Sequence, residues 1–493
     1  MKKLLYNLLA ASLLAVSVTS CNSDFMETSP TDKIDSGQVI ETMDNLVTLL
    51  SGAHRNLYGY YGYDKPGESG MNMERDILAE DVVMPNRGNG WFVNEYAWLR
   101  HIDPDSDLSA FGFSYYYGMI STANTLLSNV DNIPGDEGLR NQIKGEAYVF
   151  RAFGHFQMVQ LYGKRYEKGK DNTQLGVACV TEPTMEHKAR NTVEEVYQLV
   201  NEDIDKGITF LKGYKRENIN HFHQSVAYGI RARVALTQGN WKVAAEASAE
   251  ALRLARAEGR ELQTGESLLG GFNDVERNPE WMWASIMITE QDLSFSHFFS
   301  YMSWNFNSTP VRKSTRCIND KLYAHISSTD IRARWWDPTG TAAVPLPSYS
   351  KWKYQNRKFT SKSDGSSVND LVYMRMSEMY LIQAEALARD GNEAESRKVL
   401  HEWLVTRDPE YKLSTNSGQA LIDEILTQRR IELWGEGFRF TDLKRLNMDM
   451  DRRDTNHDQS VCTILHVPAG DSHWVWKIPT HEINSNPLME QND

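Results

Sequence analysis

Two segments of the chain interleave aromatic and polar side chains in a pattern that suits carbohydrate binding. Residues 85–98 read PNRGNGWFVNEYAW, in which one proline and two glycines are typical of a loop. Sugar rings present weakly polar C–H faces that lie flat on indole or phenol rings, and their hydroxyl groups need polar partners nearby. This segment therefore predicts a ligand-binding surface with the candidate residues Arg87, Asn89, Trp91 and Trp98. The alternative for Trp98 is that it begins a helix and packs inward.

The second segment, residues 300–310, reads SYMSWNFNSTP and adds Tyr301 and Trp304 to the candidate residues. Serine and asparagine flank both aromatics, as they would in a loop that faces solvent. Each stacked aromatic ring contributes on the order of 1 kcal/mol beyond the area it buries. Two or three such rings predict weak binding, with a dissociation constant in the micromolar to millimolar range.

The densest group of charged residues, Arg429–Arg445, has two interpretations. Its acids, which include Glu432, Glu436 and Asp442, could perform acid–base chemistry on a glycosidic bond. The interleaved arginines could equally pair with those acids in a buried network that locks a helix and a turn onto the scaffold. We favour the structural interpretation, because arginine offers bidentate partners to each carboxylate.

Other signs of enzymatic chemistry are weak. His221 and His223 are separated by one residue, which places their imidazoles on opposite sides of a strand, or about 200° apart on a helix, and suits a shared metal ion poorly. The sequence contains no HExxH, GxSxG, GxGxxG or Walker motif. We therefore predict no catalytic residue, no metal site and no cofactor, although abundant carboxylates leave a glycosidase as an alternative.

Helical hairpins are the elements expected to carry these loops. Residues 225–256 contain two apolar faces of helical period, separated by Gln238-Gly239-Asn240, and resemble a tetratricopeptide repeat. A degenerate copy spans residues 373–405, and a third pairs 139–162 with 192–211. The predicted fold is mainly α, a tetratricopeptide-like scaffold with long inserts that contain loops and short strands, at residues 59–106 and 264–365.

The N-terminus predicts export and lipid attachment. Residues 1–20 combine Lys2-Lys3 with a short apolar run, as a signal peptide does, and the segment Val18-Thr19-Ser20-Cys21 resembles a bacterial lipobox. Cys21 would then receive lipid and become the mature N-terminus. The 53 basic and 66 acidic residues give a formal charge of −13, which argues against nucleic-acid binding. The three remaining cysteines are widely scattered and predict no disulfide framework.

Five motifs stand in order along nearly the whole chain. They are FMETSPTD after Cys21, GEAYVFRAF with LYG at 145–163, YMRMSEMYLIQAEAL at 373–387, RRIELWGEGFRFTDLKR at 429–445, and IPTHEINSNPLMEQN at 478–492. Together they resemble the SusD/RagB family of outer-membrane nutrient-uptake lipoproteins. The departures from the family pattern are Trp434, where a small residue is usual, and the absence of a terminal PGY.

This resemblance implies a cell-surface lipoprotein of the outer membrane with no catalytic activity. It would bind oligosaccharide or polysaccharide and deliver it to a partner, a SusC-like TonB-dependent transporter, which contacts the helical-repeat face. It also implies an N-terminal region at 21–215 with the aromatic loop and a C-terminal region at 216–493 with the tryptophan-rich insert. The loop at 85–98 corresponds to the family's ligand platform, which favours Arg87, Trp91 and Trp98.

Three alternatives stay open at this point. A RagB-like relative of the same fold would bind a peptide or another nutrient. A helical surface glycosidase would cleave its ligand, and a pure repeat scaffold would bind no small ligand and leave the tryptophan-rich inserts unexplained.

Overall fold

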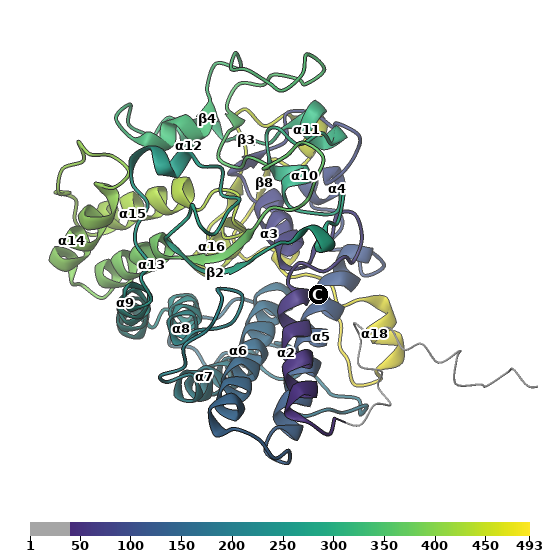
Figure 1. The fold of residues 1–493 in the computed structure, drawn as a ribbon. Coiled ribbons are helices and arrows are strands. Elements are labelled where there is room, and N and C mark those ends of the chain that lie inside the picture. The colour runs from purple at the N-terminus through teal and green to yellow at the C-terminus, as the bar shows by residue number, and fades with distance from the viewer. Residues whose placement is uncertain (1–39) are drawn as a thin grey trace, which may run out of the picture. The chain divides into compact units, whose positions relative to one another are not determined.

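The computed structural model describes residues 40–493, and residues 42–493 form one compact unit. The predicted signal peptide at 1–20 and the lipid-attachment site Cys21 lie outside the described residues. Helices dominate the unit, and its strands are short (Figure 1). None of its helices is long and apolar enough to span a membrane. The predicted fold class, a mainly α scaffold with inserts, is confirmed.

The longer helices pack side by side as successive pairs. Each helix contacts the next one in the series α5, α6, α7, α8 and α9. Helix α9 then contacts α13, although more than one hundred residues separate these two helices in the sequence. Figure 1 shows α13 beside α9, so that the array continues across the insert. The bounds are α2 (Met43–Asn56), α5 (Asp107–Asn129), α6 (Glu137–Tyr162), α7 (Val193–Phe210), α8 (Gln224–Gln238), α9 (Trp241–Ala257), α13 (Met376–Arg389), α14 (Glu393–Leu404) and α15 (Gln419–Glu432).

The hairpin of α8 and α9 shows why these residues form such pairs. Val226, Ile230 and Val234 recur with helical period and are fully buried. Gly239 ends α8 in the left-handed conformation with φ +70°, and its N–H bonds to the Ala235 and Leu236 carbonyls. Small residues on α9 allow the two helices to approach closely. The predicted helix pairs at 225–256, 373–405 and 139–162 with 192–211 are therefore confirmed as elements.

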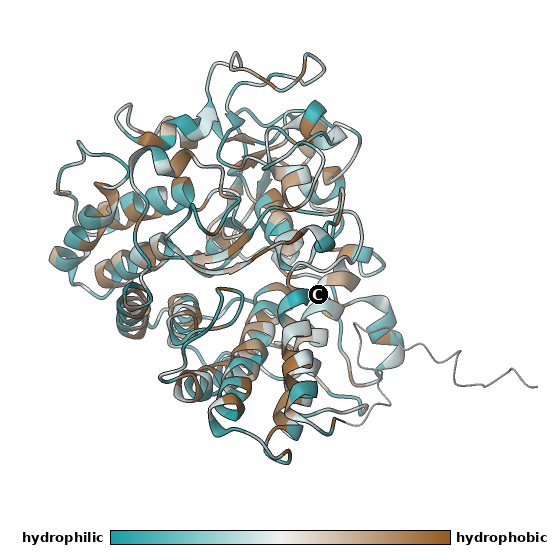
Figure 2. Cartoon of the chain, in the orientation of Figure 1, coloured by the Kyte–Doolittle hydropathy of each residue, from teal (hydrophilic) through white to brown (hydrophobic). Residues whose placement is uncertain are grey.

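The inserts and the C-terminal segment contribute shorter helices and 3-10 turns. Apolar and polar residues share most helices, as expected where one face packs inward (Figure 2). The bounds are α3 (Gly67–Leu78), α4 (Val93–Tyr96), α10 (Phe299–Met302), α11 (Thr309–Ser314), α12 (Asp320–Tyr323), α16 (Arg439–Leu446), α17 (Gln459–Cys462) and α18 (Thr480–Ser485), with 3-10 turns at Gly265–Leu269, Thr289–Gln291, Ile331–Trp335 and Ser472–Trp474.

Short antiparallel strands join distant parts of the chain. The four-stranded sheet has the order β1-β3-β5-β4, and its register pairs Val82 with Ile318. A second sheet pairs β2 with β6 and contains bulges, and a third pairs β7 with β8. The bounds are β1 (Val82–Val83), β2 (Trp281–Ser285), β3 (Cys317–Ile318), β4 (Trp336–Asp337), β5 (Gln355–Asn356), β6 (Leu371–Arg375), β7 (Met450–Asp451) and β8 (His466–Val467).

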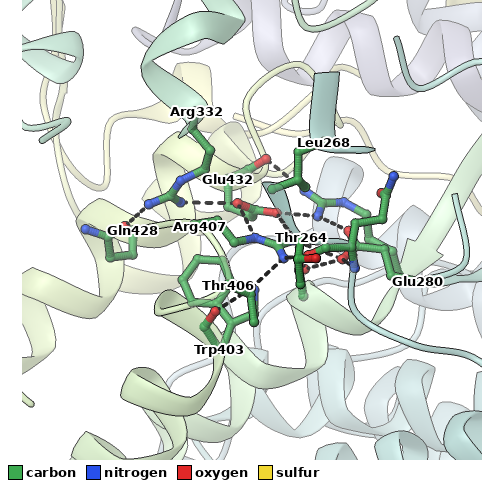
Figure 3. A network of polar contacts seen from close by, with 12 residues as sticks. Thr264, Leu268, Glu280, Arg332, Trp403, Thr406, Arg407, Gln428 and Glu432 are labelled. Atoms are coloured by element: carbon green, nitrogen blue, oxygen red, sulfur yellow. Dashed lines mark hydrogen bonds and ion pairs between the residues drawn. The ribbon is translucent and has the colours of Figure 1, made fainter. Parts of the chain in front are cut away.

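A buried ion network centres on Glu432, at the end of α15. Its carboxylate lies 2.6 Å from Arg375, 2.9 Å from Arg407 and 3.2 Å from Arg332, and Figure 3 shows it facing Arg332 and Arg407. Glu280 bonds Arg375 and Arg407 from the other side, at 2.7 and 2.8 Å. Burial alone would raise the pKa of Glu432, but the three guanidinium groups outweigh it and hold that pKa well below its usual value.

The remainder of the Arg429–Arg445 motif is paired in the same way. Asp442 lies 2.7 Å from both Arg429 and Arg445, and Arg445 reaches Glu385 on α13 at 2.8 Å. Arg439 bonds Glu80, just before β1. All six side chains are buried. The structural interpretation of this motif is therefore the one that its geometry supports.

Replacing Glu432 by glutamine should destabilise the fold strongly. The amide keeps the shape but leaves three buried guanidinium groups short of negative charge, which costs about 3–5 kcal/mol of unfolding free energy. Equilibrium unfolding in urea measures the difference. Asp423→Asn, an exposed change on the same helix, is the control and should stay within about 0.5 kcal/mol. Equal stability of the two variants would contradict the importance of the network.

Candidate functional site

Three aromatic side chains form a surface that we call the aromatic platform: Tyr60, Tyr63 and Trp91. The ring centroids of Tyr60 and Tyr63 are 6.0 Å apart, and those of Tyr63 and Trp91 are 6.4 Å apart. Tyr60 and Tyr63 are 55% and 56% exposed, and Trp91 is half-buried. The platform therefore presents aromatic surface to solvent from two separate loops.

The two tyrosines belong to a tight hairpin that precedes α3. Its ends are joined by a bridge between Tyr60 and Pro66 and by a hydrogen bond from the Tyr61 N–H to the Lys65 carbonyl. Two side chains from the other insert hold its tip. The Tyr301 hydroxyl donates to the Tyr63 carbonyl at 2.7 Å, and the Ser296 hydroxyl donates to the Gly62 carbonyl at 2.6 Å.

The loop before α4 turns Trp91 toward solvent. The Gly90 N–H bonds to the Arg87 carbonyl at 2.8 Å, which closes a turn at the loop tip. Phe92 then takes the left-handed conformation, φ +65°, which is costly for a bulky residue. Its ring is buried and lies 5.0 Å from the Tyr301 ring. One ring is thus anchored inward while the preceding Trp91 stays at the surface.

Polar candidates lie at the tip of the same loop. Arg87 and Asn89 are both exposed. The Asn86 side chain stabilises the tip by accepting from the Gly88 N–H at 2.6 Å and donating to the Lys313 carbonyl at 2.9 Å. A guanidinium and an amide beside an indole can donate to and accept from ligand hydroxyls. The arrangement suits ring stacking with hydrogen bonds at the edge.

The structure corrects the expectation for Trp98. Its side chain is 0% exposed, and its indole N–H donates to the Leu78 carbonyl at 2.7 Å. The ring packs against His101 and Trp474, at centroid distances of 5.1 and 5.0 Å. Trp98 is thus a core residue, as the inward-packing alternative held, and a ligand on the surface cannot touch it.

Tyr301 is also corrected, from a residue that faces the ligand to one that supports the platform. It is 3% exposed, its ring centroid lies 6.3 Å from that of Trp91, and its hydroxyl is bonded to Tyr63. Burial raises the pKa of this hydroxyl above its ordinary value. It therefore stays a neutral donor at physiological pH.

Trp304 lies in a different environment from the platform. Its half-buried ring is covered by the Arg357 guanidinium, 4.3 Å from the ring centroid, and its indole N–H donates to the Thr360 hydroxyl at 2.9 Å. Among the described ring contacts, none joins Trp304 to the platform. The structure thus brings Tyr301, on α10, against Trp91 of the loop that carries Arg87 and Asn89, and leaves Trp304 separate.

Sequence reasoning missed Tyr60 and Tyr63. Both lie in the run GYYGYD at 59–64, which interleaves glycines with aromatic residues as the loop at 85–98 does. This composition marks a second aromatic loop in the sequence. However, Tyr301, which bonds to Tyr63, is 238 residues away, so spacing along the chain could not show that the two residues lie together.

Comparisons with known proteins agree on one family. A model described as "SusD family" matches residues 319–493, and one described as "Starch-binding associating with outer membrane" matches residues 24–236. A SusD-like protein, P38, from Formosa agariphila is 22% identical over 437 residues, which cover 80% of this chain and 81% of that protein.

Solved structures share the fold at low sequence identity. A SusD-like carbohydrate binding protein from Bacteroides vulgatus has a TM-score of 0.79 and 23% identity, and covers 91% of this chain and 97% of its own. A SusD superfamily protein from Bacteroides thetaiotaomicron has a TM-score of 0.74 and 20% identity, over 92% of this chain and 100% of its own.

The two loop tryptophans should differ sharply in their effect on stability. Trp98→Ala removes a fully buried indole and should lower the unfolding free energy by about 3–5 kcal/mol. Trp91→Ala removes a ring at the surface and should cost about 1 kcal/mol or less. Urea unfolding of both variants tests this, and a Trp91→Ala loss as large as that of Trp98→Ala would mean that Trp91 belongs to the core.

Proposed function

The chain is a SusD-like protein, and from this premise we propose that it is a cell-surface lipoprotein that binds oligosaccharide or polysaccharide on the aromatic platform. In this proposal the protein does not cleave its ligand but delivers it to a SusC-like TonB-dependent transporter of the outer membrane. The observation that carries the proposal is the pair of exposed tyrosines beside Trp91, with Arg87 and Asn89 at the edge.

The physical chemistry of the platform favours a sugar over other ligands. Its rings offer flat surfaces for C–H faces, and the exposed guanidinium and amide groups of the same loop can exchange hydrogen bonds with ring hydroxyls. Each stacked ring adds on the order of 1 kcal/mol, and hydroxyl groups exchange bonds to water for bonds to protein with little net gain. The resulting weak affinity suits a protein that passes its ligand onward.

The state of the nearby carboxyl groups supports binding without catalysis. Asp64 lies 3.2 Å from Lys65 and 3.3 Å from Arg100, and Glu95 is also paired with Arg100. Glu74 has the raised pKa that a general acid needs, because it is buried and close to Glu95 and Asp64. However, Glu74 is only 1% exposed, so a ligand on the platform does not reach it.

The proposed anchor and location rest on the N-terminal sequence and the family. The lipobox-like Val18-Thr19-Ser20-Cys21 would place lipid on Cys21. The family description that matches residues 24–236 names association with the outer membrane. Trp304, whose ring is partly exposed beside Arg357, is proposed as a second contact for an extended glycan chain.

Removing the Trp91 ring should weaken glycan binding at least ten-fold without unfolding the protein. Isothermal titration of the purified chain against a panel that includes starch-derived oligosaccharides identifies a ligand, and Trp91→Ala is then titrated with the same ligand. Tyr61→Ala is the matched control, because Tyr61 lies on the same hairpin and is 42% exposed, but its described ring contacts are with Phe111 and Tyr115 and not with the platform.

The control should change affinity less than two-fold. Unchanged affinity in Trp91→Ala would show that the ligand binds elsewhere, even though the family assignment would stand. A similar loss in both variants would mean that the hairpin as a whole, rather than the platform rings, determines binding.

Incubation with the glycan that binds should release no new reducing ends. The carboxyl groups beside the platform are either paired with cations or buried, so no acid–base pair faces the ligand. A colorimetric assay for reducing ends over many hours measures this. Accumulation that scales with protein concentration would support the glycosidase alternative instead.

A further inference from the structure

A cluster of two histidines and one glutamate lies away from the platform, at the junction of three elements. His54 is in the last turn of α2, Glu146 is on α6, and His221 lies in the loop before α8. The His54 Nε2 is 2.6 Å from one Glu146 oxygen, and the His221 Nδ1 is 3.1 Å from both. The two imidazole rings lie 4.6 Å apart between centroids.

Glu146 differs from the other buried carboxylates in its partners. Glu432, Glu385 and Asp442 are each paired with arginine. Glu146 is fully buried, and its ion pairs among residues 40–493 are with His54 and His221 alone. Burial raises the pKa of Glu146, but the two histidines outweigh it and hold that pKa below its usual value. The direct ion-pair partners of this buried charge are thus groups that are weak cations at neutral pH, and Arg216, which is paired with Glu258, attracts it from farther away.

Each histidine alone is a poor permanent cation here. Burial lowers the pKa of His54, despite the attraction of Glu146. Burial also opposes protonation of His221, but its hydrogen bond and attraction to Glu146 raise its pKa above the ordinary value. The three side chains bring two imidazole nitrogens and a carboxylate oxygen close together, largely out of contact with solvent. This is a donor set that a divalent cation can bind.

We propose that His54, Glu146 and His221 form a binding site for a divalent transition metal ion, with Zn²⁺ as the best-matched ion. Two imidazole nitrogens and one carboxylate oxygen are a frequent set of zinc ligands, which leaves a fourth position for water. One such atom from each residue lies within 4.8 Å of the others. His221, 20% exposed in its side chain, provides the route from solvent.

The three ligand atoms lie within 4.8 Å of one another, so zinc binding requires the side chains to shift toward a common centre. Ligands at about 2 Å from a tetrahedral zinc ion are roughly 3.3 Å from one another. The His221 nitrogen is already 3.1 Å from Glu146, whereas His54 must move away from its hydrogen-bonded position by less than about 1 Å. The ion takes the place of the proton that His54 now shares with the carboxylate.

The surroundings hold Glu146 in place and predict moderate affinity. The carboxylate also accepts from the Phe222 N–H at 3.0 Å and from the Gln142 amide at 2.9 Å, which fixes its orientation. The His54 Nδ1 is buried and has no partner among the described residues. Metal-bound histidines normally donate from their second nitrogen, so its lack of an acceptor makes the site weaker than a typical structural zinc site.

Binding at this site would tie α2, α6 and the loop before α8 together. The same loop carries His223, which is paired with Glu258 at 2.9 Å and begins α8. The spacing of His221 and His223 suited one metal poorly, and the structure indeed directs them to different carboxylates. The second imidazole is that of His54, 167 residues before His221, and not that of His223.

Zinc titration of the full chain, freed of metal with a chelator and then dialysed, tests the proposal. Calorimetry should show one Zn²⁺ per chain with micromolar affinity, and His221→Gln should weaken it at least ten-fold. His223→Gln is the matched control, in the same loop and also paired with a carboxylate, and should stay within two-fold. Co²⁺ should give a visible absorption spectrum that His221→Gln removes.

Affinity should also fall as pH is lowered to about 5, because protons compete for His221 and His54. Thermal unfolding without metal checks that the variants are folded. His221→Gln is the variant on which the test depends, because His54 is buried and a change there could prevent folding. The proposal is overturned if the parent chain binds no equimolar Zn²⁺, or if His221→Gln binds it as tightly as the parent does. Both results are independent of glycan binding.

Discussion

The structure depends most on the pairing of buried guanidinium groups with buried carboxylates around the end of α15. A charge removed from water must have a close partner, and several pairings here join segments that are far apart in sequence. Glu432 connects β6 to the segments that carry Arg332 and Arg407. Arg430 and Arg439 extend the pairing to Asp81 and Glu80, next to β1.

The ion pairs of Glu80 and Asp81 also stabilise the candidate site, because these residues precede β1 and β1 leads into the loop that carries Trp91. The Trp434 indole donates to the Asp81 carbonyl at 2.8 Å, which joins the Arg429–Arg445 motif to the residue before β1. Beyond β1, Phe92 and Tyr301 form a buried layer beneath the exposed rings. The ion pairs next to β1 therefore hold the strand that leads into the platform loop, and the packing of Phe92 and Tyr301 supports the platform rings from the interior.

Patterns of neighbouring residues predicted the helical hairpins and the buried ion network, because the residues that indicate both are close together in the sequence. The hairpin of α8 and α9 follows from apolar periodicity with Gly239 between the helices, and the interleaved charges of Arg429–Arg445 indicated a paired network. The loop at 85–98 predicted the site only in part. Whether Trp91 or Trp98 faces solvent depends on the left-handed turn at Phe92 and on Trp474 in the distant C-terminal segment. Such long-range partners leave no periodic signal.

The measurement that tests the central claim most directly is a crystal structure of the chain with the oligosaccharide that it binds. The account predicts an intact glycan with a sugar ring stacked on Trp91 and its hydroxyl groups near Arg87 or Asn89, with Tyr60 and Tyr63 alongside. A glycan seated on another face, with Trp91 free of contact, would contradict the account.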